Sequence, residues 1–257
     1  MKHFCLLALL LSTHFLIAQN NVTDTIILKD SVKNLRFNYK QLIIPTVLIG
    51  YGFIGLNSDQ IKDFNADVQD EITENIDRNF TIDDIMQYAP AATVYALNAF
   101  GDKGKNNIKD RSIILASSYL MMSVTVLALK NTTHIERPDG SSNNSFPSGH
   151  TATAFAGAEF LWQEYKDKSI WYGVGGYIVA TATGIFRVVN NRHWVTDVAA
   201  GAGIGILSTK IAYWIYPYLN KKVFTQNKNT QKENKVSSIV IPYYNGKQMG
   251  CGLVMQF

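Results

Sequence analysis

The sequence has little charge and no basic stripe, and each absence excludes a class of protein. Charged residues make up only 17% of the 257 residues, whereas about 25% is usual for soluble domains. Several helices that are apolar almost all round would explain this deficit. The net charge is only +4, and lysine and arginine are scattered without interleaved aromatic residues. The composition therefore argues against nucleic acid as a partner.

Cysteine is also scarce, and histidine is not grouped with other metal-binding residues. Cys5 falls in the apolar start of the chain and Cys251 near its end. Removal of the start would leave Cys251 alone, which excludes an intramolecular disulfide. Acidic residues gather between residues 58 and 86, and all five histidines lie outside that segment. The sequence therefore predicts no metal site and no cofactor.

The first residues predict export from the cytoplasm. Lys2 and His3 precede an apolar run of 15 residues, Phe4 to Ala18. This run is short for a membrane span of about 20 residues, which favours a cleaved signal peptide over a retained anchor. We expect a signal peptide at residues 1–18 and a polar lead-in at residues 19–40.

Residues 41–220 are expected to form an all-α helical bundle. Most of its long apolar segments carry no charge, and the last one contains only Lys210. Glycines recur in two of them, which suits close helix packing in lipid. We expect about five membrane-embedded helices; a soluble bundle with buried helices is the alternative. The apolar segments are residues 41–56, 91–100, 112–129, 151–163, 169–186 and 198–217.

Two further segments differ from this pattern. Residues 58–86 have apolar positions three and four residues apart, which predicts an amphipathic helix at a surface or interface. These positions are Ile61, Phe64, Val68, Ile72 and Ile76. Residues 221–257 predict a polar linker followed by a C-terminal β-hairpin with an Asn245-Gly246 turn.

Three short motifs stand in order beside the apolar segments. Together, K-x6-R-P, P-S-G-H and R-x5-H-x3-D resemble the signature of the type 2 phosphatidic acid phosphatases (PAP2). Bacterial class A acid phosphatases and vanadium haloperoxidases share this signature. The resemblance covers about residues 110–217 and implies the PAP2 type of helical bundle. One departure is Phe186, where the family usually has serine. The motifs are Lys130 to Pro138, Pro147 to His150, and Arg187 to Asp197.

The same residues suit phosphoryl transfer on chemical grounds. The phosphoryl group in flight spreads negative charge over three oxygens, which cationic side chains can stabilise. Lys130, Arg137 and Arg187 supply three cations, and arginine can bind two oxygens in a fork. Ser148 and Gly149 precede a predicted helix, whose free N–H groups favour an anion. These five residues are the candidate phosphate-binding set.

Two histidines can divide the catalytic work. His193 is the candidate nucleophile, because Asp197 four residues later can fix and stabilise its imidazole. His150 is the candidate general acid, and then the base that activates water. The resemblance implies the same assignment. Taken singly, Lys130 could be an interface anchor and Asp197 a helix cap.

We therefore expect a metal-independent phosphatase that hydrolyses a lipid phosphate or pyrophosphate through a phosphohistidine. A soluble periplasmic acid phosphatase is the alternative, followed by a vanadium haloperoxidase and a non-catalytic envelope protein. The short turn with Lys166 and Lys168 fits the cytoplasmic side. The active site would then face the periplasm, with the membrane and a lipid phosphate as partners.

Overall fold

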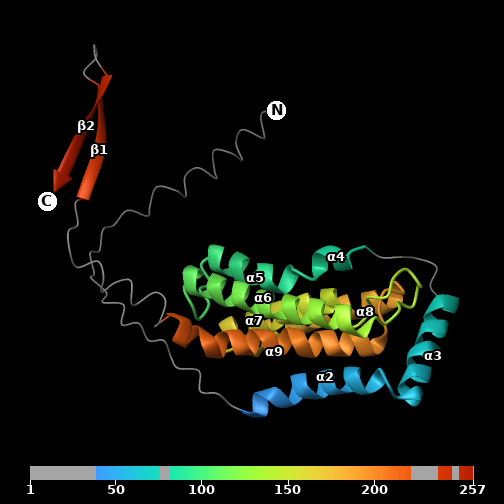
Figure 1. Cartoon of the computed structure of the whole chain (residues 1–257). Helices are drawn as coiled ribbons and strands as arrows, with labels where there is room; N and C mark the ends of the chain where they lie inside the picture. Colours follow the sequence, from blue (N-terminus) through green and yellow to red (C-terminus); the bar gives the residue numbers. More distant parts are fainter. Residues whose placement is uncertain (1–38, 76–80, 221–236, 245–248, 257) are drawn as a thin grey trace, which may run out of the picture. The chain divides into compact units, whose positions relative to one another are not determined.

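The computed structural model describes residues 39–75, 81–220, 237–244 and 249–256. The predicted signal peptide, most of the lead-in and the polar linker lie outside these residues. Helices dominate the described part of the chain (Figure 1). They are a 3-10 turn η2 (Tyr39–Leu42) and the α-helices α2 (Ile43–Gly55), α3 (Asp59–Asn75), α4 (Asp83–Met86), α5 (Ala89–Ala99), α6 (Ile108–Thr133), α7 (Gly149–Tyr165), α8 (Ile170–Val189) and α9 (Val195–Leu219).

The helices form an all-α bundle, as the sequence predicted. Helix α7 lies at its centre. It packs against α5, α6, α8 and α9, and α2 covers another face of α9. Consecutive helices from α5 to α9 reverse direction (Figure 1). As a result, the connections α6–α7 and α8–α9 lie at the same end of the bundle, which we call the motif end. The three motifs are thereby brought together.

The number of membrane spans differs from the prediction. By length and composition, α6, α8 and α9 can cross a membrane, and a fourth span is possible only if α2 and α3, bent by 92°, count as one. The expected five embedded helices are therefore too many among the described residues. Helix α7 has 17 residues and α5 has 11, both short of the usual span of about 20. These spans support a membrane location.

Glycine allows α9 to contact α7 directly. A Cβ at Gly201 would overlap the carbonyl oxygen of Ser148, and one at Gly205 would overlap that of Ala152. Gly203 makes a similar close approach to α2. The predicted close packing is thus found at these glycines, whereas Gly175 faces open space. The contact at Gly201 fixes the first turn of α9 beside the start of α7, where the second motif lies.

Ionisable side chains are buried between the helices away from the motif end. Lys210 on α9 donates to Glu159 on α7 at 2.7 Å, and Glu159 is only 1% exposed. Tyr177 of α8 donates to the other oxygen of the same carboxylate. A second buried pair joins Arg111 of α6 to Glu164 of α7 at 3.8 Å. These charges are satisfied by partners within the bundle, as buried charges must be.

Helix α3 lies within the segment where the sequence predicts an amphipathic helix, and its most buried side chains are polar. Its buried residues are the polar Asn65 and Gln69, whereas Phe64 is 48% exposed. Asn65 donates to the hydroxyl of Thr196 at 3.0 Å, and Gln69 donates to Asn191. Ile61, Val68 and Ile72 are half-buried on the same side of the helix. The predicted stripe therefore faces inward, and its two polar members hydrogen-bond to the third motif.

The two strands form a separate small element near the C-terminus. Strand β1 (Ser237–Tyr244) pairs antiparallel with β2 (Met249–Gln256). Ser237 lies opposite Gln256 in this register. The Asn245-Gly246 turn that the sequence predicts falls outside the described residues.

Candidate active site

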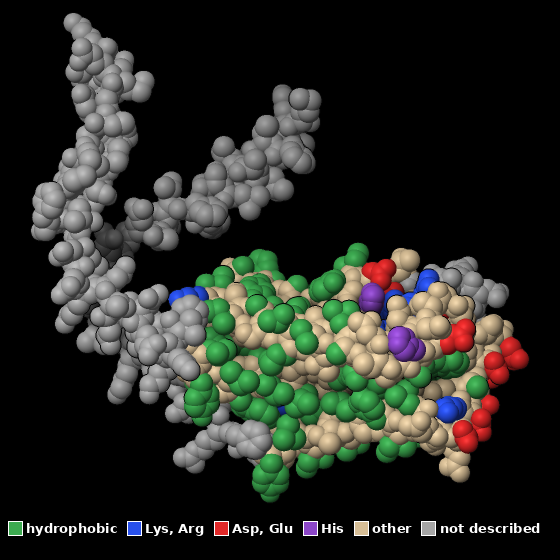
Figure 2. All heavy atoms as spheres, in the orientation of Figure 1, with side chains coloured by type: hydrophobic (Ala, Val, Ile, Leu, Met, Phe, Trp, Pro, Cys, Tyr) green, Lys and Arg blue, Asp and Glu red, His purple; other side chains and the backbone are tan. Residues whose placement is uncertain are grey.

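The motif residues gather at the motif end, where charged side chains interrupt an otherwise apolar surface (Figure 2). Lys130 stands in the last turn of α6, and Ser148 is the N-cap of α7. Arg187 lies in the last turn of α8, and Asp197 in the first turn of α9. The helix order alone therefore collects residues that are 67 positions apart at the extremes, Lys130 and Asp197.

His193 and Asp197 form the buried centre of the site. The Nδ1 atom of His193 lies 3.6 Å from Oδ2 of Asp197, and both side chains are at most 2% exposed. Helix α9 begins only at Val195, so the two residues do not share a helical turn as expected. Asp197 instead accepts the backbone N–H of Trp194 at 2.9 Å and turns back toward the histidine. The pairing arises from capping, and Asp197 serves as both cap and partner.

Ser145 is a member of this centre that the sequence reading missed. Its hydroxyl donates to Oδ2 of Asp197 and lies 3.4 Å from Nδ1 of His193. The residue is fully buried. Ser145 stands two residues before Pro147, the first residue of the second motif. This position could have suggested a role, but serine is too common in loops to stand out.

Burial controls the protonation of His193. Loss of hydration lowers its pKa to about 4, against the opposing effect of Asp197 and with a further lowering by Lys130 and Arg187. The imidazole is therefore neutral at pH 7. A neutral imidazole has the free lone pair that a nucleophile requires.

Two cations of the first motif are bound to the loop that precedes the second motif. The Nζ atom of Lys130 donates to the backbone oxygens of Asn144 and Ser145. Nε of Arg137 donates to the side-chain oxygen of Asn144 at 3.0 Å. Burial, and then the charge of Arg187, lower the pKa of Arg137. The loop thus holds both cations near the third, Arg187.

Ser148 and Gly149 have different roles in the first turn of α7. The hydroxyl of Ser148 accepts from the backbone N–H of Thr151 at 3.4 Å and contacts the Thr151 hydroxyl at 2.9 Å. It is therefore used as a helix cap. A Cβ at Gly149 would have its nearest neighbour, Val126, 3.8 Å away. Such a side chain would stand in ordinary van der Waals contact with α6, so Gly149 is not required for the packing of the helices at this point.

Acidic residues reach the site, contrary to the expectation that those of residues 58–86 stay away from the motifs. Asp83 of α4 accepts from Nη1 of Arg187 at 2.7 Å. Asp84 places its Oδ1 2.9 Å from Nε2 of His150. This contact could not be predicted from the motifs, because Asp84 lies 46 residues before Lys130, the first motif residue. The apolar segment that forms α5 follows α4 directly and packs on α7, which indicates that α4 lies close to the bundle.

The other charged residues of the motif region lie at its edge. His134 is exposed and ends α6 in the left-handed conformation, with φ of 50°. Arg192 pairs with Asp139 at 2.9 Å and not with Asp197. Phe186, where serine is usual, is half-buried beside Arg187.

This fold and constellation define a helical domain with two histidines and three cationic side chains gathered at its motif end. Residues 111–221 match the family model described as PAP2 superfamily. This segment contains all three motifs, so the family model matches the same part of the chain that carries the motif resemblance.

Similarity to a known protein extends beyond that segment. The chain is 34% identical to "Lipid A 1-phosphatase" of Porphyromonas gingivalis, over 89% of this chain and 53% of the relative. It is 38% identical to "Bacitracin transport permease protein BcrC" of Bacillus licheniformis, over 30% of this chain and 36% of the relative. The chain thus spans about half or less of the length of these relatives.

A solved structure with a similar chain course is the first transmembrane PAP2 type phosphatidylglycerolphosphate phosphatase from Bacillus subtilis. Its sequence is 19% identical, and the match has a TM-score of 0.49 over 75% of this chain and 99% of that one.

Proposed function

We propose that this chain is a metal-independent phosphatase that removes phosphate from a lipid phosphate or pyrophosphate through a phosphohistidine. The observation that carries the proposal is the buried, neutral His193 with its carboxylate partner beside three cationic side chains. Such an arrangement provides a nucleophile and neutralises a transferring phosphoryl group without a metal ion.

Each site residue has a role in this reaction. His193 attacks phosphorus, while Asp197 stabilises the charged imidazole that results. Arg187, Arg137 and Lys130 bind the phosphoryl oxygens, assisted by backbone N–H groups next to Gly149. His150 donates a proton to the leaving oxygen and then takes one from water, and the hydroxide formed breaks the phosphorus–nitrogen bond. Ser148 supports this arrangement through its cap of α7.

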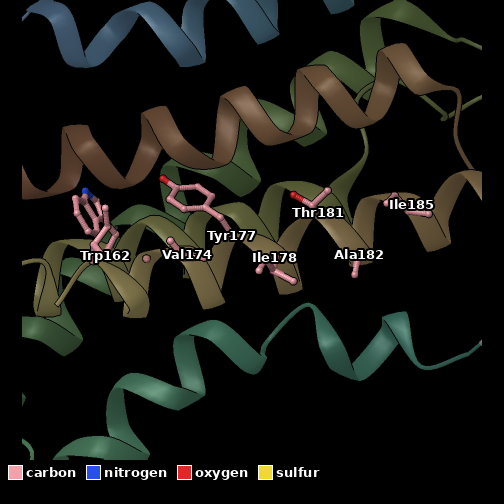
Figure 3. A pocket seen from close by; sticks show the side chains of 9 residues that line it. Trp162, Val174, Tyr177, Ile178, Thr181, Ala182 and Ile185 are labelled. Carbon is pink, nitrogen blue, oxygen red and sulfur yellow. The ribbon is translucent and has the colours of Figure 1, made fainter.

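A lipid substrate is supported by the apolar surface that leads to the site. A groove of about 680 Å³ runs along α8, from Trp162 of α7 to Ile185 (Figure 3). Ile185 also borders a second apolar cavity of about 440 Å³, which reaches Val189 and Val195 within the third motif. Acyl chains could therefore lie beside α8 with the phosphate at Arg187. The similarity to a lipid A 1-phosphatase makes a lipid A 1-phosphate the first substrate to test.

The catalytic domain is proposed to extend over residues 41–220, since α3 and α4 contact the third motif and Arg187. The signal peptide at residues 1–18 would export the chain. Lys105, Lys166 and Lys168 lie at the end opposite the motifs, which fits the positive cytoplasmic side of membrane proteins. The site would then face the periplasm.

The purified chain is expected to release phosphate from a lipid phosphate in the presence of EDTA, because protein cations neutralise the phosphoryl charge. The measurement is phosphate release from lipid A 1-phosphate, phosphatidic acid, phosphatidylglycerol phosphate and undecaprenyl pyrophosphate, with and without vanadate. Vanadate should inhibit, since it can imitate the five-coordinate transition state. Activity lost in EDTA and restored by Mg²⁺ would contradict the mechanism. Turnover of water-soluble monoesters alone would indicate an acid phosphatase, and halide oxidation with vanadate a haloperoxidase.

The orientation can be tested by cysteine labelling of a variant in which Cys5 and Cys251 are serine. A cysteine at the exposed Asn143, in the loop of the second motif, should react with a membrane-impermeant thiol reagent in cells with a permeable outer membrane. A cysteine at the exposed Asp167, at the opposite end, should react only after the inner membrane is disrupted. The reverse pattern would place the site in the cytoplasm.

A further inference from the structure

Two acidic residues of α4 contact the site from outside the PAP2 segment. Helix α4 has only four residues, Asp83–Met86, and precedes the matched residues 111–221. Its two aspartates nevertheless contact one residue each from the second and third motifs, namely His150 and Arg187. This helix therefore belongs to the site by contact, although no motif includes it.

Asp83 anchors α4 to the bundle. It is 1% exposed, and its carboxylate accepts from Nη1 of Arg187 at 2.7 Å and from Asn190 at 3.3 Å. The Nε atom of Arg187 is buried and has no hydrogen-bond partner among the described residues. Asp83 thus binds Nη1 of the guanidinium, and Nε remains as a donor for a phosphate oxygen.

Asp84 lies next to the second histidine. Its Oδ1 atom is 2.9 Å from Nε2 of His150, and its side chain is 61% exposed. With Nε2 engaged, Nδ1 is the ring nitrogen left for a substrate. Asp197 is paired with His193 in a similar way, but its carboxylate faces Nδ1 of the ring.

We propose that Asp84 is the positioning residue of His150, which it holds so that Nδ1 faces the leaving oxygen. This inference rests on the proposed phosphatase function. In the first step, the bond from His193 to phosphorus forms as the phosphorus–oxygen bond breaks, and the leaving oxygen takes the Nδ1 proton of His150. Nε2 keeps its own proton, which it donates in the hydrogen bond to Asp84. In the second step, Nδ1 accepts a proton from the attacking water and the imidazolium is restored.

The charges around His150 agree with this role. Burial, followed by the charge of Arg187, lowers the pKa of His150, whereas Asp84 and Asp83 raise it. A general acid must hold its proton when substrate binds, so the two carboxylates oppose the effects that would remove it. Without Asp84, the protonated form should be lost at lower pH.

The test compares Asp84→Ala with Asp67→Ala, an exposed aspartate of α3 that serves as the matched control. The measured quantity is kcat/KM as a function of pH for an alkyl lipid phosphate and for p-nitrophenyl phosphate. The latter has a leaving group that needs little protonation. We expect Asp84→Ala to lower the alkyl value ~10- to 100-fold and the nitrophenyl value only a few-fold. The alkaline limb of the alkyl profile should move to lower pH.

Asp84→Glu, which keeps the carboxylate, should restore most of the alkyl activity and the position of the alkaline limb. Equal losses with both substrates and an unmoved limb would overturn the proposal. Increased activity of Asp84→Ala would also overturn it, since the carboxylate would then obstruct the site. If neither the wild type nor Asp67→Ala releases phosphate from any substrate, the proposed function itself has failed, and this inference fails with it.

Discussion

Replacement of His193 by alanine is expected to abolish phosphoenzyme formation and to lower kcat by ~10⁴-fold or more. The residue supplies the attacking nitrogen, and no other described histidine is paired with a buried carboxylate. The measurement is rapid-quench labelling with a radiolabelled lipid phosphate. A phosphohistidine is identified by a label that is lost in acid and retained in base. The alanine variant should give none.

His150→Ala is the companion variant, because it removes the proton donor and leaves the nucleophile. It should still be labelled slowly by p-nitrophenyl phosphate, whose leaving group needs little protonation. Hydrolysis of the phosphoenzyme should then be slow, since no base activates water, and label should accumulate. Labelling of His193→Ala combined with no labelling of His150→Ala would show that the two roles are exchanged.

Asp197→Asn is expected to lower kcat ~10²- to 10⁴-fold while leaving measurable turnover. The amide can still accept the N–H of Trp194, so the cap of α9 can persist. It cannot stabilise the positive imidazole that forms when His193 is phosphorylated. An amide N–H directed at Nδ1 would also favour the wrong tautomer. The rate of phosphoenzyme formation under single-turnover conditions measures this loss directly.

The pH profile separates this chemistry from a loss of fold. His193 has a pKa of about 4, so wild-type phosphorylation should decline only as the pH falls through about 4. Because the carboxylate of Asp197 raises that pKa, its removal should move the acid limb to still lower pH.

Asp139→Asn, which alters the surface pair with Arg192, is the matched control. Its rate should change by less than about two-fold, since surface ion pairs contribute little. A similar loss in both variants would contradict a specific role for Asp197.

The convergence of the motifs could be predicted from the sequence because the order of helices determines it. Lys130 follows one apolar segment, His150 opens the next, and His193 lies between the last two. Helices that reverse direction must then place these residues at one end. The helical architecture required only hydrophobic patterning, and the motif residues do meet where this reasoning places them.

The parts that sequence reasoning missed depend on contacts between distant polar residues. Asn65 and Gln69 lie on or beside the apolar stripe of α3, but polar residues there give no sign of which groups they bind. Their actual neighbours, Thr196 and Asn191, can be found only in three dimensions. The same holds for Asp84 and His150, which are 66 residues apart. The number of spans was overestimated because α7 is apolar through burial among other helices and is too short to cross.

The buried pair of Glu159 and Lys210 has a consequence for how the chain enters the bilayer. A single charge at the centre of a helix opposes insertion by about 2.5–3.5 kcal/mol on translocon scales. Lys210 is on α9, which is long enough to cross, so α9 carries this penalty until Glu159 of α7 lies beside it. Insertion of α9 without α7 would expose Lys210 to lipid with no partner. We therefore expect α9 to enter the bilayer already packed on α7, with the charge of Lys210 matched by Glu159.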